Sequence, residues 1–447
     1  MKRFITIFAL LAIMGCSKNY LDKKPDKSII VPVTYNDLQS LLDNTQDIFN
    51  WDPCLGFIGS DDYRIEDNYW QYLNTATERN AYIWNKEIYE GGSNTDWNKT
   101  YGQVLYSNVI LEQLGKLQPA DADTATWNTL NGSALFYRGT AFFNLLQLYA
   151  APFTGIDLET KPGIPLRLTA NVDAPVTRAS LVESYNRAIT DLEEAVTLLP
   201  VLASYKTRPS KAAAFGMLAR AYLVMRNYEK AKAAAIACLA ISNDLMDYNQ
   251  LDPSKARPIA QFNEEVIFHS TLNSYGINST AYVDGSLLAS YDDNDLRKSI
   301  FVNNTSGLPM YRGSYSGSNR LFSGISTNEM VLTLAECYAR LEEEHKAMEE
   351  LNRLLQTRFV TGAFTPLTAG TPEEALTIIL AERRKELLFR NTRWTDLRRL
   401  NLEPDHAVTL ERTLNGVTYT LPPNDMRYVY PIPPDEIQIS GIEQNKR

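Results

Sequence analysis

Two stretches of this sequence share one spacing of apolar and small residues, and this repeat restricts the possible folds more than any other feature. Ala219 and Ala231 are as far apart as Ala335 and Ala347. The matching positions are Phe215, Leu218, Ala219, Tyr222, Ala231, Ala235 and Cys238, and then Val331, Leu334, Ala335, Tyr338, Ala347, Leu351 and Leu354. This spacing is typical of the tetratricopeptide repeat, a helix–turn–helix unit of about 34 residues. Because alanine lets two helices approach closely, each stretch is predicted to form a packed helix pair.

Further segments predict more helices of this kind. A second-helix pattern ends before Pro200, and its first-helix partner is expected at 134–149, with residues 150–180 inserted between them. A helix over about 97–117 completes another pair. The second-helix pattern consists of Tyr185, Ala188, Leu192 and Ala195. We therefore predict a mainly α-helical fold, a tetratricopeptide superhelix of about four helix pairs. Its scaffold segments are about 97–149, 183–243 and 327–360.

Two long segments interrupt the helical pattern. Residues 50–96 are rich in Asp, Asn, Tyr and Trp, and residues 250–326 are rich in Ser, Asn, Gly and Tyr. Loops this long are usually either functional or disordered, and their aromatic content argues against disorder. We expect residues 33–447 to form a single domain in which these inserts build a loop-rich, ligand-binding subdomain.

The first residues have the layout of a cleaved secretory signal. Lys2 and Arg3 precede a short apolar run over residues 4–14, and Gly15 stands before Cys16. The run is shorter than the roughly 20 residues that span a bilayer. A bacterial signal peptidase that reads this pattern leaves Cys16 as an acylated N-terminus, and stable anchoring needs about two lipid chains. The prediction is a signal peptide over 1–15 and a lipidated tether over 16–32. The alternative is an ordinary secretion signal with a chance cysteine.

Composition excludes several classes of function. The formal net charge is −9, and loss of residues 1–15 removes two positive charges. An acidic surface argues against binding to nucleic acid or to anionic lipid, so membrane attachment would rest on the N-terminal lipid. The remaining cysteines are Cys54, Cys238 and Cys337. Their odd number excludes a full disulfide framework, and we expect Cys238 and Cys337 to be buried as small apolar residues.

No catalytic pattern is present in the sequence. The three histidines show no ligand spacing, and there is no glycine-rich phosphate loop and no Gly-x-Ser-x-Gly elbow. The adjacent acids Asp61–Asp62 and Asp292–Asp293 do not by themselves place two carboxylates about 5–10 Å apart across a glycosidic bond. The charged run 382–399 is interpreted as a helix with paired charges and with Leu387, Leu388 and Phe389 turned inward. We expect no catalytic residue, no cofactor and no metal site, although Ca²⁺ near the acidic loops stays open.

Several motifs occur in an order that resembles one family. They are Leu21-Asp22 and Pro25 after the lipid cysteine, Ser60-Asp61-Asp62-Tyr63, Glu382-Arg383-Arg384-Lys385-Glu386-Leu387, Arg393-Trp394-Thr395-Asp396-Leu397-Arg398-Arg399, and Tyr430-Pro431-Ile432-Pro433 followed by Glu436-Ile437. Together with the repeats, they resemble the SusD/RagB family of outer-membrane nutrient-binding lipoproteins. The resemblance covers essentially the whole chain after Cys16.

The chain departs from the family pattern in two places. Arg390-Asn391 stands where the family often has Glu-Gly. Asn tolerates the left-handed conformation needed at a helix end, so the turn is expected to persist while one buried ion pair is in doubt. The acidic tract that often follows the lipid cysteine is replaced by residues 17–20, Ser-Lys-Asn-Tyr. Exposure on the cell surface therefore rests on the family resemblance.

The resemblance implies a partner and a role. The partner would be a SusC-like TonB-dependent outer-membrane barrel. The lipoprotein would sit over the barrel as a lid, capture an oligosaccharide or a peptide outside the cell, and close when the ligand is loaded. The repeats would then form the scaffold and the side that faces the barrel.

The two inserts supply the candidate ligand residues. A pyranose presents an apolar face that stacks on an aromatic ring, while its hydroxyls need polar partners, and Tyr and Trp offer rigid contact area. We expect the ligand surface to come mainly from the 60–85 and 275–320 loops. The candidates are Asp61, Asp62, Tyr63, Trp70, Tyr72, Tyr275, Tyr291, Tyr311 and Arg312. The alternative is that most of these aromatic residues, taken one by one, belong to the hydrophobic core or to the contact with the barrel.

Two other functions are compatible with parts of the sequence. A periplasm-facing tetratricopeptide lipoprotein that scaffolds protein assembly would explain the repeats and the lipid, but not the aromatic inserts or the Pro-Ile-Pro ending. A secreted hydrolase would have to turn over a polysaccharide. Protease treatment of intact cells separates surface capture from a periplasmic scaffold.

Overall fold

The computed structural model describes residues 32–91, 94–117, 119–304 and 307–447. The predicted signal peptide, Cys16 and all but the last residue of the tether lie outside these ranges. Among the described residues, no helix is both long and apolar enough to cross a membrane.

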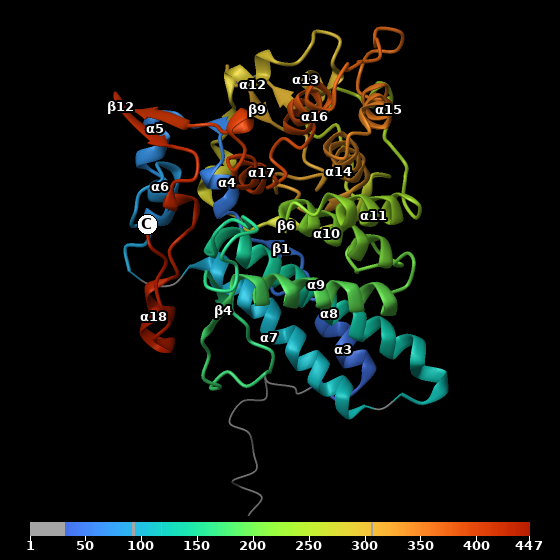
Figure 1. Ribbon diagram of the computed structural model, residues 1–447, viewed down its shortest axis with the longest axis vertical. Coiled ribbons are helices and arrows are strands. Elements are labelled where there is room, and N and C mark those ends of the chain that lie inside the picture. Colours follow the sequence, from blue (N-terminus) through green and yellow to red (C-terminus); the bar gives the residue numbers. More distant parts are fainter. Residues whose placement is uncertain (1–31, 92–93, 118, 305–306) are drawn as a thin grey trace, which may run out of the picture.

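Long helices stack side by side through most of the molecule (Figure 1). α7 packs on α8, α8 on α9, α9 on α10, and α10 on α11. These helices are α7 (Thr95–Lys116), α8 (Thr124–Tyr149), α9 (Leu181–Leu198), α10 (Lys211–Val224) and α11 (Tyr228–Leu239). Capping residues in the local sequence set where these helices begin. Ser180 and Glu183 form a capping box at the start of α9, and Asn227 caps α11. Such side chains satisfy the free N–H groups of a first helical turn.

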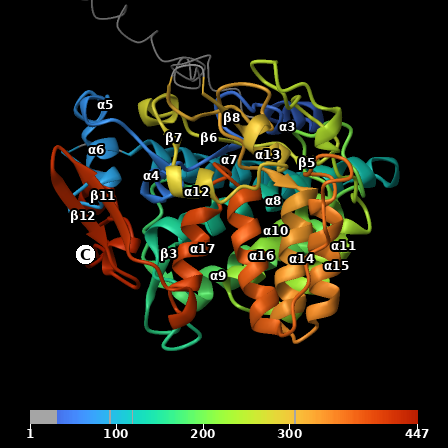
Figure 2. The ribbon, with the colours of Figure 1, turned by 90° about the horizontal axis from the view of Figure 1, so that it is seen from above.

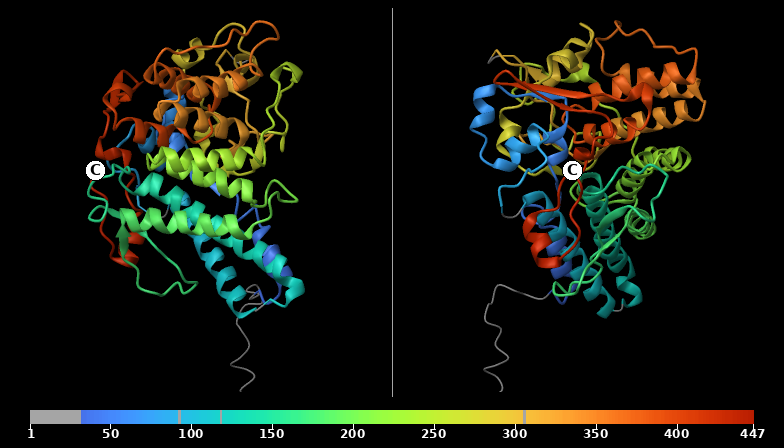
Figure 3. Two further views of the ribbon diagram at one scale, coloured as in Figure 1. Left: turned by 45° about the vertical axis from the view of Figure 1, so that its right-hand side comes forward. Right: turned by 60° about the vertical axis from the view of Figure 1, so that its left-hand side comes forward.

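The stack continues into the C-terminal helices. α11 contacts α14, and α14 contacts both α15 and α16, so the helices run from α7 at one end of the molecule to α16 at the other (Figure 3). The remaining long helices are α14 (Thr327–Arg340), α15 (Glu344–Leu355), α16 (Pro372–Glu386) and α17 (Arg393–Leu400). The mainly α-helical fold is confirmed, and the helices pair as the repeated spacing predicts.

Small residues sit where the paired helices come closest. Ala219, Ala231, Ala335 and Ala347 are completely buried. In the α8–α9 pair, a Cβ atom on Gly139 would lie 2.9 Å from the carbonyl oxygen of Ala188. The approach of these backbones therefore depends on the absence of a side chain there.

Short strands connect the two inserts to each other. In a four-stranded sheet the order is β2-β7-β9-β8, so a strand of the first insert pairs with β7 and joins three strands of the second insert in one sheet. The strands are β2 (Tyr63–Arg64), β7 (Tyr282–Val283), β8 (Val302–Asn303) and β9 (Met310–Tyr311). β1 (Trp51–Asp52) also pairs in parallel with β6 (Thr271–Leu272). The inserts thus fold together, on one side of the helices (Figure 2).

The other elements are short. The helices are α3 (Tyr35–Leu42), α4 (Leu55–Gly59), α5 (Asp67–Gln71), α6 (Ala76–Tyr82), α12 (Gly285–Ala289), α13 (Leu296–Phe301) and α18 (Pro434–Ser440). Two-stranded pairs are β3 (Pro162–Pro165) with β4 (Arg178–Ser180), β5 (Val266–Phe268) with β10 (Ile325–Ser326), and β11 (Leu410–Leu414) with β12 (Val417–Leu421). The β11–β12 turn uses Asn415 and Gly416 at positive φ, as tight hairpins require.

The charged run 382–399 is structural, as its sequence pattern indicates. Leu387, Leu388 and Phe389 are buried. Many of its charges also lie inside the molecule, where they pair with residues from other elements: Arg399 with Glu336 and Glu386 with Arg358. Cys54, Cys238 and Cys337 are free and buried, which confirms the expectation for Cys238 and Cys337.

The Arg390-Asn391 departure changes one contact but keeps the turn. Asn391 has a φ of 64°, the left-handed conformation expected there. Arg390 is buried, and its guanidinium lies 3.6 Å from the centre of the Tyr315 ring. Within the described part of the chain, Arg390 forms no ion pair. An arginine stacked on an aromatic ring thus occupies this position.

Candidate functional site

A cavity of about 340 Å³ opens beside the sheet that joins the two inserts. β8 and β9 supply part of its wall, the loops over 274–281 and 312–321 supply most of the rest, and Phe389 after α16 closes it from the helical side. The lining residues are Arg257, Ser274, Tyr275, Asn278, Ser279, Ala281, Asn303, Met310, Tyr311, Arg312, Ser314, Ser318, Asn319, Arg320, Leu321 and Phe389. The wall therefore combines aromatic rings with hydroxyl, amide and guanidinium groups, as ligand pockets commonly do.

Tyr311 is held in place by aromatic contacts. Its ring centre lies 4.6 Å from that of Phe389 and 6.1 Å from that of Phe301. The fold allows this packing because Gly313 follows closely: a Cβ atom there would lie 2.3 Å from the Phe301 ring. Burial raises the pKa of the Tyr311 hydroxyl, so this side chain stays neutral. A fixed, half-buried ring at a cavity wall is suited to stacking on a ligand.

Tyr275 forms a second aromatic part of the wall. It precedes the 3-10 turn Gly276–Ser279 and packs against the hydrophobic core. Burial, together with the nearby Asp96 carboxylate, raises the pKa of its hydroxyl. Asp96 itself accepts hydrogen bonds from the backbone of Cys54 and Leu55 and from Asn273.

Arg312 is fixed by the backbone around it. Its guanidinium donates to the carbonyl oxygens of Ser299 at 2.6 Å, Pro253 at 2.8 Å and Lys255 at 3.1 Å. Burial and the neighbouring Arg257 lower the pKa of Arg312. On the other side, the guanidinium of Arg320 lies 4.5 Å from the centre of the Trp51 ring, a cation–π distance.

Of the residues proposed from the sequence, the structure brings Tyr275, Tyr311 and Arg312 together at this cavity. The 60–85 loop, which was expected to share the ligand surface, contributes no residue to the lining. A ligand surface on that loop stays a prediction. The first insert instead supports the cavity from behind, through the pairing of β2 with β7.

Asp61 and Asp62 are bound by arginines of the C-terminal helices. Asp61 lies 2.7 Å from Nε of Arg393 and 3.0 Å from Nη2 of Arg384, and Asp62 lies 3.1 Å from Nε of Arg384. Burial raises the pKa of Asp62. Burial would also raise that of Asp61, but the two guanidiniums outweigh it and hold the pKa of Asp61 below its usual range. These contacts give the acid pair a structural role, and its predicted ligand role stays a prediction.

Tyr63 and Tyr291 are also structural. Both are buried, and their hydroxyls donate to the carbonyl oxygens of Ile58 and Lys385, each at 2.8 Å. The core covers both rings in this structure, so a ligand would reach them only after a rearrangement, and their ligand role stays a prediction.

Trp70 and Tyr72 lie at α5, away from the cavity. The half-buried Trp70 donates its indole N–H to the carbonyl oxygen of Arg79 at 3.1 Å. Tyr72 is 82% exposed. Sequence reasoning did not select Arg257, Arg320 or Phe389, since nothing in their local patterns shows that they meet in space.

The ionisable side chains of the cavity wall are arginines and tyrosines. None of its lining residues is an Asp, Glu or His. Among the residues that the structure describes, no group of three or more His, Cys, Asp and Glu side chains is placed to hold a metal ion. What this wall offers is a surface for binding.

Comparison with known proteins agrees with this architecture. At 24% identity over 392 residues, covering 72% of this chain and 74% of the relative, the sequence is similar to SusD-like protein P38 of Formosa agariphila. The structure is similar to a putative sugar binding protein from Bacteroides vulgatus, with a TM-score of 0.75 and 21% identity over 93% of this chain and 99% of that chain. It is also similar to a laminarin binding SusD-like protein, with a TM-score of 0.66 and 18% identity over 92% of this chain and 98% of that chain.

Two family models match successive parts of the sequence. Residues 19–223 match the model described as starch-binding associating with outer membrane. Residues 220–446, about half of the chain, match the model of the SusD family. The chain therefore belongs to the SusD family, which is associated with the outer membrane.

Proposed function

We propose that this protein is a glycan-binding lipoprotein of the cell surface that acts with a SusC-like TonB-dependent outer-membrane barrel. The observation that carries the binding role is the cavity of about 340 Å³ with Tyr275, Tyr311 and Arg312 in its wall. The printed descriptions of the matching family and of a laminarin-binding structural neighbour support a glycan as ligand. A peptide is the alternative ligand.

In this proposal the tetratricopeptide helices are the scaffold and the second insert holds the ligand. A sugar ring would stack on Tyr311, which Phe389 and Phe301 keep in position. Its hydroxyls would meet the serine, asparagine and arginine side chains of the wall. Binding would take place without catalysis, and the barrel would take over the ligand for transport.

The first test compares two pairs of substitutions in the binding of an oligosaccharide panel by calorimetry. Tyr275→Ala with Tyr311→Ala should weaken binding, because each lost stacking contact costs about 0.5–1.5 kcal/mol. Trp70→Ala with Tyr72→Ala is the matched control and should leave the affinity unchanged, since neither residue lines the cavity. Equal affinity in the Tyr275/Tyr311 variant, or a loss only in the control, would place the ligand elsewhere.

The partner is tested separately, by purification of the C-terminally tagged protein from native outer membranes. Recovery of one large β-barrel in near-equal amount is the expected result. Recovery of periplasmic assembly factors without a barrel would instead favour the periplasmic scaffold. Release of shortened sugars during incubation with the oligosaccharide panel would contradict binding without catalysis.

A further inference from the structure

The cavity wall carries positive charge and no negative charge. Its charged residues are Arg257, Arg312 and Arg320, and its other lining residues are neutral. This is unusual for a chain with a formal net charge of −9. The local charge therefore has the opposite sign to that of the protein as a whole.

No acidic side chain neutralises these three arginines among the residues that the structure describes. Arg312 donates to three backbone carbonyl oxygens. Arg257 contacts the carbonyl oxygen of Ala256 at 3.3 Å, and Arg320 lies over the Trp51 ring.

An acidic residue on the helical side is already paired with arginines. Glu386, which lies close enough to affect the pKa of Tyr311, is bound by Arg358 at 2.8 Å and by Arg297 at 3.2 Å. Arg390, which follows Phe389 in the chain and stacks on Tyr315, is a further buried cation without an ion pair in the described ranges. Among the described residues, the positive charges of the cavity wall therefore have no acidic partner, and they are available to pair with negative groups on a ligand.

A second hollow has acidic as well as basic residues in its lining, so the absence of acids is a feature of the first cavity. It shares Arg312 and Asn303 with the first cavity, but Asp293, Asp295 and Lys298 also line it. Asp295 is bound by the buried Arg297, and Asp293 by Lys298. The cavity beside Tyr311 and Tyr275, by contrast, combines aromatic rings with arginines and has no acidic residue in its lining.

We propose that this cavity selects an acidic glycan, one that carries carboxylate or sulfate groups on its sugar rings. This inference rests on the proposed glycan-binding function and names the ligand class of the same site. Arg257 and Arg320 would contact the anionic groups, because the guanidinium fork matches planar carboxylate and sulfate-type oxygens. Arg312 would keep the wall in shape through its backbone contacts, while Tyr311 and Tyr275 would stack on the rings.

The test measures the binding of three probes of equal length by calorimetry: a tetragalacturonate, a sulfated carrageenan tetrasaccharide and the neutral laminaritetraose. We expect at least one acidic probe to bind about tenfold or more tightly than the neutral one, as charge-assisted hydrogen bonds allow. The affinity for that probe should fall between about 50 and about 300 mM NaCl, since salt screens exposed charges. The carboxylated and sulfated probes identify which group is bound.

Substitutions then assign the effect to the wall. The variant Arg257→Gln with Arg320→Gln should bind the acidic probe about tenfold more weakly, with little change for the neutral probe. Arg353→Gln is the matched control, because Arg353 is a half-buried arginine of α15 that is paired with Glu350 and lies outside the cavity. A thermal melt of each variant shows that it is folded.

The outcomes separate this inference from the function on which it rests. Equal binding of neutral and acidic probes, unchanged in the arginine variant, would overturn the acidic specificity and leave glycan binding intact. Binding of an oligoglutamate peptide with no binding of any glycan would overturn both.

Discussion

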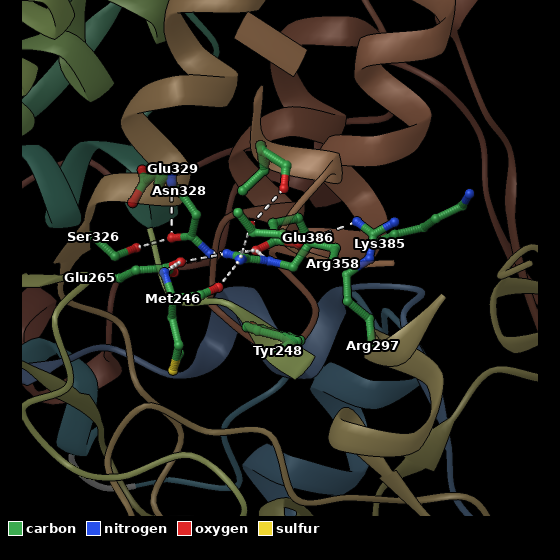
Figure 4. Close-up of polar contacts among 12 residues, drawn as sticks. Met246, Tyr248, Glu265, Arg297, Ser326, Asn328, Glu329, Arg358, Lys385 and Glu386 are labelled. Carbon is green, nitrogen blue, oxygen red and sulfur yellow. Dashed lines mark hydrogen bonds and ion pairs between the residues drawn. The ribbon is translucent and has the colours of Figure 1, made fainter. Parts of the chain in front are cut away.

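Arg358 and Glu386 lie side by side inside the molecule, with Nη2 of the arginine 2.8 Å from Oε1 of the glutamate, and neither side chain is exposed (Figure 4). Arg358 also reaches Oε1 of Glu265 at 2.6 Å, and Arg297 binds the other oxygen of Glu386 at 3.2 Å. This network joins α16, the end of α15 and the second insert. Buried charges of this kind are tolerated only when each has its partners.

Removing one partner should therefore destabilise the protein strongly. Arg358→Ala leaves Glu265 and Glu386 buried with one cation fewer, and the expected loss in the free energy of unfolding is about 3–5 kcal/mol. Urea denaturation followed by circular dichroism measures it. Glu373→Gln, an exposed change in the first turn of α16, serves as the control and should alter stability by less than about 1 kcal/mol.

The same network predicts a loss of stability in acid. Burial would raise the pKa of Glu386, but Arg358 and Arg297 outweigh it and lower the pKa to about 2. An unfolded glutamate titrates near pH 4.3, so the contribution of Glu386 is complete above that pH. It is lost as the pH falls towards about 2. The free energy of unfolding, measured from pH 7 to pH 3, should decrease, and it should decrease less in Glu386→Gln than in the Glu373→Gln control. Equal pH dependence in both variants would contradict this account.

Two glycines in the helical scaffold should respond to alanine in opposite directions. A Cβ atom on Gly139 would lie 2.9 Å from the carbonyl oxygen of Ala188 and 3.0 Å from Cγ of Leu192, so Gly139→Ala should destabilise by about 1–3 kcal/mol. A Cβ atom added to Gly102 in α7 would have nothing within 4 Å. Gly102→Ala should stabilise by about 0.5–1 kcal/mol, because it lowers the entropy of the unfolded chain. Thermal unfolding of both variants tests the sign of each change.

The N-terminal prediction can be tested in cells. Cys16→Ala removes the thiol that would carry the lipid, so the protein should move from the membrane fraction to the soluble fraction. Protease treatment of intact cells should digest the unsubstituted protein if it faces outwards. A Cys16→Ala protein that stays in the membrane fraction would show that the lipid is not its anchor.

The sequence by itself determined the helical scaffold, because the features that encode it are local. Ala219, Ala231, Ala335 and Ala347 repeat at a spacing that places small residues where paired helices meet, and all four are buried. Caps such as Ser180 and Asn227 are equally local. The sequence also singled out the adjacent Tyr311 and Arg312, an aromatic ring beside a guanidinium in a long loop, and both line the cavity.

Only the tertiary structure decided which of the remaining candidates line the cavity and which are covered by the core or paired with other side chains. Asp61 has the same local appearance whether it faces a sugar or an arginine, and its partners Arg384 and Arg393 are more than 300 residues away along the chain. Tyr63 is covered by the core, whereas Arg257 reaches the cavity from a segment with no distinctive pattern. Burial and charge pairing depend on which distant segments pack together, and local spacing in the sequence does not encode that.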